Sequence, residues 1–141
     1  MSKHYASAKW NGNLPEGNGT YTLKSSGYQG KVNFKSRFED GDESSPEELI
    51  GAALSACFSM ALSNELDQAG AEPKSIETAA EVTLAKTGDS FSITEIALKT
   101  KGNVSGIDED KFREIADKAK ENCPVSRALK DVNVTLNAEL I

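Results

Sequence analysis

Alternating apolar and polar residues predict three short strands in the first part of the chain. The expected strands lie near residues 5–10, 19–25 and 31–38, and turn-sized stretches rich in Gly, Ser and Asn separate them. Consecutive short strands joined by such turns are typical of a meander. We therefore expect a three-stranded antiparallel sheet at the start of the chain.

The clearest element is a long apolar helix that begins at Ser45. Ser45 suits the N-cap, a proline follows it, and Glu48 lies three residues later, which is a capping-box arrangement. Residues 49–62 carry no charge, so this helix is apolar on nearly every side. That stretch is too short to cross a bilayer. We expect a central, buried helix that ends near Gln68, with Gly70 as its stop signal.

The second half of the chain begins with the pattern of a hairpin. Val82 and Leu84 alternate in one arm, and Phe91 and Ile93 alternate in the other. The apolar phase then slips to Ile96 and Leu98, which predicts a β-bulge near Thr94 and Glu95.

A second helix and a last strand complete the predicted order. Asp108 suits the cap of an amphipathic helix over residues 109–121, and Pro124 stops it and opens a short helical turn. Alternation over 132–140 predicts a half-buried strand. The resulting βββ-α-ββ-α-β order indicates one α+β domain spanning residues 1–141.

Charge and composition exclude several classes of function. The chain has 141 residues with 22 acidic and 16 basic side chains, a net charge of −6, which disfavours nucleic acid and anionic membranes as partners. The only histidine is His4, which argues against Ser-His or Cys-His hydrolases and against metal sites built on imidazoles. The polar N-terminus lacks the apolar core of a signal peptide, so we expect a cytoplasmic protein.

Two cysteines carry the remaining candidate chemistry. Cys57 and Cys123 lie 66 residues apart, without the C-x-x-C spacing of zinc ribbons or thioredoxin-like proteins. In a reducing cytosol they are either two buried small hydrophobes or a transient, redox-active pair. Cys123 precedes a proline at a helix break, where free backbone amides favour some thiolate character.

Cys57 needs a nearby cation in order to react. It lies in the middle of the long helix, far from the N-terminal dipole that activates many cysteines. Of the three arginines, Arg113 has the spacing to form ion pairs with acidic residues of its own helix at the surface, and Arg127 is interpreted as a positive charge at the end of a helix. Arg37, which ends the third predicted strand just before the cysteine helix, is either a solvated strand-end residue or this cation.

Helix geometry separates Glu47 from Glu48. At ~100° per residue, Glu48 lies opposite Cys57, whereas Glu47 lies closer to its face but about 15 Å away along the axis. Two copies of the helix packed antiparallel near residue 52 would place Glu47 of one copy beside Cys57 of the other. A composite site at a dimer interface is therefore one interpretation of the apolar helix. A helix wrapped by sheet within one monomer is the other.

A pair of separated thiols suits peroxide reduction. The first thiolate takes an oxygen and becomes a sulfenic acid, and the second thiol condenses with it to form a disulfide before over-oxidation occurs. This chemistry requires no metal and no organic cofactor.

Three sequence runs resemble the OsmC/Ohr family. They are residues 45–53, 56–63 and 122–126, which correspond to the cysteine-helix signature and the second-cysteine motif. The likeness extends along essentially the whole chain and is closer to the osmotically inducible OsmC branch. One position departs from that branch, where histidine is common three residues before the cysteine and this chain has Leu54.

The resemblance implies a thiol-dependent peroxidase that reduces organic hydroperoxides, and less efficiently hydrogen peroxide, in an antioxidant stress response. It implies an intertwined homodimer around two central helices, with the sites at the interface. Cys57 would be the attacking thiol and Cys123 the resolving thiol. Arg37, held by Glu47, would stabilise the thiolate and polarise the peroxide, and an external dithiol would recycle the disulfide.

The expected substrate pocket is apolar. Leu54, Phe58 and Met60 are its candidate lining residues, with plain core packing as the alternative for all three. Competing functions on the same fold are a non-catalytic stress or ligand-binding protein and a redox-sensing switch.

Overall fold

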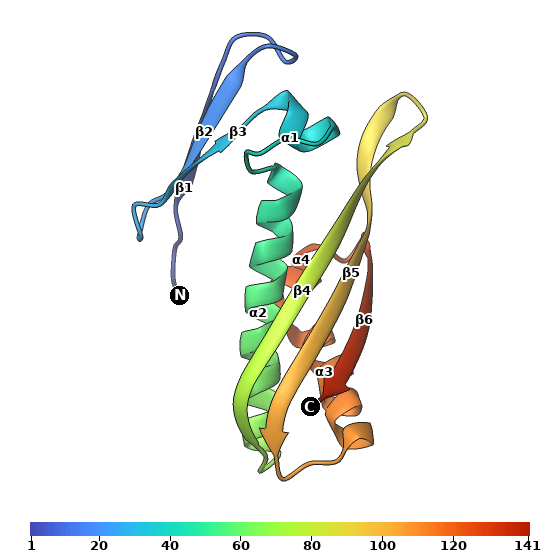
Figure 1. Ribbon diagram of the computed structural model, residues 1–141. Helices are drawn as coiled ribbons and strands as arrows, with labels where there is room; N and C mark the ends of the chain where they lie inside the picture. The colour runs from blue at the N-terminus through green and yellow to red at the C-terminus, as the bar shows by residue number, and fades with distance from the viewer. The chain divides into compact units, whose positions relative to one another are not determined.

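The computed structural model describes residues 1–141, and the chain divides into two units, Met1–Leu49 and Ile50–Ile141 (Figure 1). Each unit has its own three-stranded sheet. The predicted α+β class is confirmed, with two short helices in addition to the two long ones.

The first unit contains the predicted meander. Its strands are β1 (Ala6–Asn11), β2 (Asn18–Leu23) and β3 (Gln29–Val32). They pair antiparallel in the order β1-β2-β3.

The prediction that the third strand continues to residue 38 is wrong. After Val32 the chain turns into a short helix, α1 (Phe34–Phe38), whose cap is Asn33. The side chain of Asn33 accepts a hydrogen bond from the amide of Ser36 at 2.8 Å. Phe34 and Phe38 are four residues apart, a spacing that suits one helix face, and their ring centroids are 4.9 Å apart.

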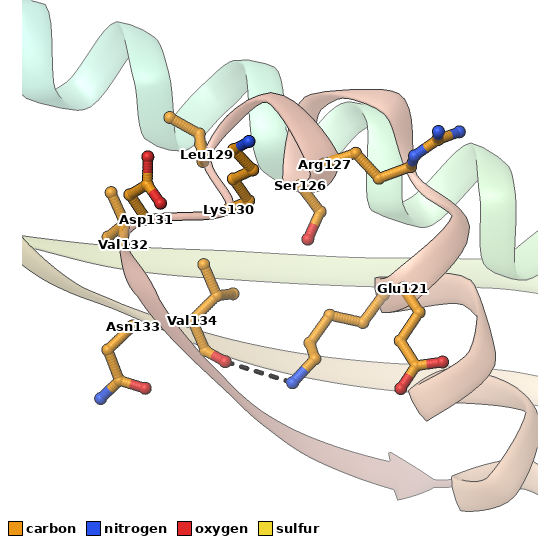
Figure 2. Close-up of a pocket in the computed structure, with 10 residues that line it drawn as sticks. Glu121, Ser126, Arg127, Leu129, Lys130, Asp131, Val132, Asn133 and Val134 are labelled. Carbon is orange, nitrogen blue, oxygen red and sulfur yellow. Dashed lines mark hydrogen bonds between the residues drawn. The ribbon is translucent and has the colours of Figure 1, made fainter.

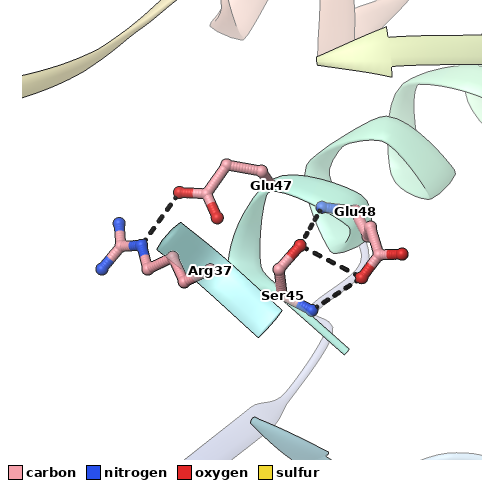
Figure 3. A network of polar contacts seen from close by, with 4 residues as sticks. All are labelled: Arg37, Ser45, Glu47 and Glu48. Carbon is pink, nitrogen blue, oxygen red and sulfur yellow. Dashed lines mark hydrogen bonds and ion pairs between the residues drawn. The ribbon is translucent and has the colours of Figure 1, made fainter. Parts of the chain in front are cut away.

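The long helix α2 (Pro46–Gln68) begins with the predicted capping box (Figure 3). The amide of Glu48 donates to Ser45 Oγ at 3.1 Å, and the amide of Ser45 donates to Glu48 Oε2 at 2.8 Å. The predicted stop is confirmed too, because Gly70 has a φ of 85°, which favours glycine.

Within the single chain, α2 is buried along one stripe rather than on all sides. Leu54, Phe58, Leu62 and Leu66 lie fully inside the core of the second unit. Met60 is 74% exposed. The expectation that this helix is too short to cross a bilayer is wrong, because its 23 residues are long and apolar enough to do so by length and composition alone. Its stripe of core residues is nevertheless what a helix of a globular fold presents. The expectation of a fully buried helix is therefore not met by one copy of the chain.

The sheet of the second unit is built from a long hairpin and the last strand. Its members are β4 (Glu72–Thr87), β5 (Ser90–Ser105) and β6 (Asn133–Leu140), in the order β4-β5-β6. Thr83 pairs with Glu95 and Leu84 with Ile93, so Thr94 is the extra residue of the predicted bulge.

Two helices connect β5 to β6, which is why these strands pair in parallel (Figure 1). They are α3 (Glu109–Asn122) and α4 (Pro124–Ala128). Asp108 caps α3 as predicted, accepting from the amide of Lys111 at 2.8 Å. The apolar face of α3 is buried in the same core as the α2 stripe.

Candidate active site

The fold brings the two cysteines together. Cys57, in the middle of α2, and Cys123, which joins α3 to α4, have their sulfur atoms 2.8 Å apart as free thiols. Cys57 is half-buried and Cys123 is fully buried. Two thiols this close can form a disulfide with little movement of the backbone.

The surroundings of Cys123 keep it protonated. Burial raises the pKa of the Cys123 thiol, and its hydrogen bond to Cys57 raises it further, while the amides of Ser126 and Val125 oppose this more weakly. The side chain forms no cap hydrogen bond at the start of α4. The expected thiolate character of Cys123 is therefore wrong, because loss of solvent outweighs the nearby amides.

The first unit holds the cation that the sequence singled out. Arg37 is on α1, and its Nε donates to Oε1 of Glu47, in the first turn of α2, at 3.0 Å (Figure 3). Figure 3 shows the two Nη atoms of Arg37 pointing away from this carboxylate. The Glu47 side chain is 8% exposed and that of Arg37 is 41% exposed.

Glu47 and Glu48 have different contacts. Glu48 belongs to the capping box with Ser45, whereas Glu47 contacts Arg37 and leaves its second oxygen, Oε2, buried without a hydrogen-bond partner. The capping role of Glu48, argued from helix geometry, is confirmed, and the contact of Glu47 with Arg37 is the one that the family resemblance implied.

Arg37 also lines an apolar cavity of about 470 Å³ within the first unit. The apolar side chains around it are Trp10, Leu14, Val32, Phe34, Phe38 and Pro46. Sequence reasoning did not find this cavity. The only feature of the sequence that could have indicated this cavity is the presence of large apolar residues in short segments that are otherwise exposed.

The three residues expected to line a substrate pocket are not on one surface of the chain. Leu54 and Phe58 are fully buried in the core, as plain core packing would have them. Met60 lies ~200° around the helix from Phe58, at an open groove of about 850 Å³ beside α2 and the start of β4.

The other two arginines lie at the surface, as expected from the sequence. Arg113 forms an ion pair with Glu109 at 2.9 Å within α3. Arg127 is in the last turn of α4, beside a cavity of about 610 Å³ (Figure 2). In Figure 2 its guanidinium points away from Val134, whose carbonyl accepts a hydrogen bond from Lys120 Nζ at 3.2 Å.

Sequence and structure comparisons identify relatives of this chain. The OsmC-like protein family matches residues 39–137. The chain is 48% identical over 134 residues to Peroxiredoxin OsmC of Escherichia coli K12, covering 94% of this chain and 93% of that protein. It is 33% identical over 107 residues to Organic hydroperoxide resistance protein-like 2 of Staphylococcus epidermidis RP62A, covering 72% of each.

Solved structures share the fold. An organic hydroperoxide resistance protein OsmC from Legionella pneumophila superposes with a TM-score of 0.77 at 22% identity over 99% of both chains. An OsmC-like protein from Vibrio cholerae gives a TM-score of 0.78 at 19% identity, over 98% of this chain and 99% of that one.

The fold, the facing thiols and these relatives define the class, a thiol-dependent peroxidase. The chain belongs to the OsmC family.

Proposed function

We propose that this chain reduces organic hydroperoxides to alcohols through the Cys57 and Cys123 thiols. The observation that supports this most directly is the 2.8 Å separation of the two sulfur atoms. A buried and a half-buried thiol on different elements, held face to face, suit a resolving and an attacking role.

In the first step the Cys57 thiolate attacks one oxygen of ROOH. The O–O bond breaks, Cys57 becomes a sulfenic acid, and the alkoxide takes up a proton to leave as ROH. In the second step the Cys123 sulfur attacks the Cys57 sulfur, the S–O bond breaks, and water leaves with the thiol proton of Cys123. An external dithiol then reduces the disulfide to two thiols and is itself oxidised to a disulfide.

Arg37 is the proposed cation of the first step. Because Glu47 is about 15 Å from Cys57 along its own helix, the guanidinium held by Glu47 in one copy of the chain would stabilise the attacking thiolate of the other copy in the proposed homodimer and polarise the peroxide oxygens. The apolar cavity that Arg37 lines supports an organic rather than an inorganic peroxide as substrate. We therefore infer a preference for bulky alkyl hydroperoxides over hydrogen peroxide.

The proposed assembly is a homodimer. The small residues Ala52, Ala53 and Ala56 are exposed on an apolar helix, and small side chains allow two helices to pack closely. A second copy of α2 is the proposed cover for this face. Sedimentation should give the mass of two chains in solution, and a monomer at all concentrations would contradict the assembly. The proposed location is the cytoplasm, whose reducing conditions keep both thiols free between turnovers.

Thiol counting after stoichiometric cumene hydroperoxide tests the catalytic proposal. The wild-type chain should lose both thiols, Cys57→Ser should keep its remaining thiol, and Cys123→Ser should stop at a sulfenic acid. A dithiol-coupled assay should then show faster turnover with cumene hydroperoxide than with hydrogen peroxide. Retention of both wild-type thiols would favour a ligand carrier, and oxidation without sustained turnover would favour a redox switch.

A further inference from the structure

A second polar contact joins α2 to the end of α3, apart from the cysteine pair. Oε2 of Glu65, on α2, forms an ion pair with Lys118 Nζ at 2.9 Å, and Oε1 accepts a hydrogen bond from Asn122 Nδ2 at 3.4 Å. The Glu65 side chain is 16% exposed, although that of Lys118 is 63% exposed. Both carboxylate oxygens therefore have partners on the last turns of α3.

This contact is close to the thiols along both elements. Glu65 follows Cys57 by two helical turns, about 12 Å along the axis of α2. Asn122 is the residue immediately before Cys123. The amide of Cys123 donates to Ala119 at 2.9 Å, so the backbone that carries the sulfur continues directly from the anchored turn.

The carboxylate is ionised at neutral pH. The ammonium of Lys118 lowers the pKa of Glu65, and Asn122 adds to this effect against the opposing influence of partial burial. The link between the two helices is thus a charge-assisted one, which is stronger and more directional than a bond between neutral groups.

We propose that Glu65 is a positioning residue for disulfide closure, because its carboxylate holds the end of α3 on α2 and so keeps Cys123 opposite Cys57. The inference rests on the proposed function and concerns only its second step. In that step Cys57–SOH and Cys123–SH become a disulfide and water, and the rate depends on how often the two sulfurs are in contact.

The buried state of Cys123 makes this positioning important. Burial raises the pKa of the Cys123 thiol, so little of it is ionised, and proximity must compensate for its weak nucleophilicity. If the anchor is removed, the sulfenic acid should persist for longer and meet a second peroxide. The product of that encounter is the sulfinic acid, which can no longer condense with the Cys123 thiol to form the disulfide.

Glu65→Ala is the principal test, measured on the full chain in two separate steps. The rate of Cys57 thiol loss after mixing with cumene hydroperoxide should change by less than about twofold, because Glu65 does not take part in that step. The rate of disulfide formation, followed by quenching and mass analysis, should fall about tenfold, since a misplacement of ~1 Å can cost as much as about 100-fold. The sulfinic fraction at excess peroxide should rise.

Matched variants separate positioning from general loss of structure. Glu114→Gln removes the Lys111–Glu114 pair, 3.2 Å long, whose two members are both on α3, so both rates should stay at the wild-type value. The charge-swapped double variant Glu65→Lys, Lys118→Glu should recover much of the closure rate that Glu65→Ala loses.

Wild-type closure by Glu65→Ala would overturn the proposal, as would failure of the charge swap to improve on Glu65→Ala. If Glu65→Ala does not fold, Asn122→Ala and Lys118→Ala each remove one contact, and wild-type closure in both would overturn it equally. Failure of the peroxidase proposal itself looks different, because the wild-type chain would then show no Cys57-dependent loss of thiols at all.

Discussion

Removing the two partners of the Arg37–Glu47 ion pair one at a time should have unequal effects on stability. The pair is 3.0 Å long, but Glu47 is almost fully buried while Arg37 is partly solvated. Arg37→Ala leaves a buried carboxylate with neither oxygen bonded, because Oε2 already lacks a partner. Removing the charge of Glu47 instead leaves a guanidinium that water can reach.

The magnitudes follow from this asymmetry. Stranding a fully buried charge costs about 3–5 kcal/mol. Because solvent already screens Arg37, we expect Arg37→Ala to lower the free energy of unfolding by about 2 kcal/mol. Glu47→Gln keeps an oxygen to accept from Nε and removes the charge that Oε2 holds without a partner, so the expected change is below about 1 kcal/mol.

Urea unfolding at one fixed protomer concentration measures these differences. The double variant Arg37→Ala, Glu47→Gln should be more stable than Arg37→Ala alone by about 1 kcal/mol, because it no longer buries an unpaired charge. Under the proposed function both single variants also slow Cys57 oxidation, so Glu47→Gln should be stable yet slow. If Glu47→Gln costs as much stability as Arg37→Ala, or the double variant is simply additive, the reasoning from the buried carboxylate is wrong.

Three further predictions concern the scaffold. In Gly102→Ala the new Cβ would lie 2.6 Å from the buried ring of Phe112, so thermal unfolding should report a loss of about 1–3 kcal/mol, and an unchanged midpoint would contradict the tight packing. Ser45→Ala removes the N-cap of α2 and should cost about 1 kcal/mol in urea unfolding, whereas Ser45→Thr, which keeps the hydroxyl that accepts from the Glu48 amide and donates to the Glu48 carboxylate, should retain most of this stability. The pKa of Glu65 is lower in the folded protein than in the unfolded chain, where it is near 4.3, so ionised Glu65 stabilises the fold above that pH. This stabilisation is lost as the pH falls through the pKa that Glu65 has in the folded protein. The wild-type chain should therefore lose more stability than Glu65→Gln on acidification below about pH 4.3, and parallel pH profiles would refute the linkage.

Local signals in the sequence predicted much of the fold because their causes are local. A capping box acts between residues three apart, so Ser45 and Glu48 alone mark the start of α2. The slip in apolar phase near Thr94 marks the bulge in the same way. The short helix α1 was missed because five residues carry too little periodicity to tell a helix from a strand end.

The sequence by itself determined the class of fold, the helix that carries Cys57, and the two cysteine motifs that resemble the OsmC/Ohr family. It determined these because they depend on the period of apolar residues, on caps and on short runs of neighbouring residues.

Only the tertiary structure decided the 2.8 Å approach of the two sulfurs, the raised pKa of Cys123 and the contact of Glu65 with the end of α3. It also decided that one copy of the chain buries α2 along a single stripe. The physical reason is that these features depend on the packing of different segments, which for the two sulfurs and for Glu65 with Asn122 lie more than fifty residues apart. No periodicity within a segment records which surface another segment will cover.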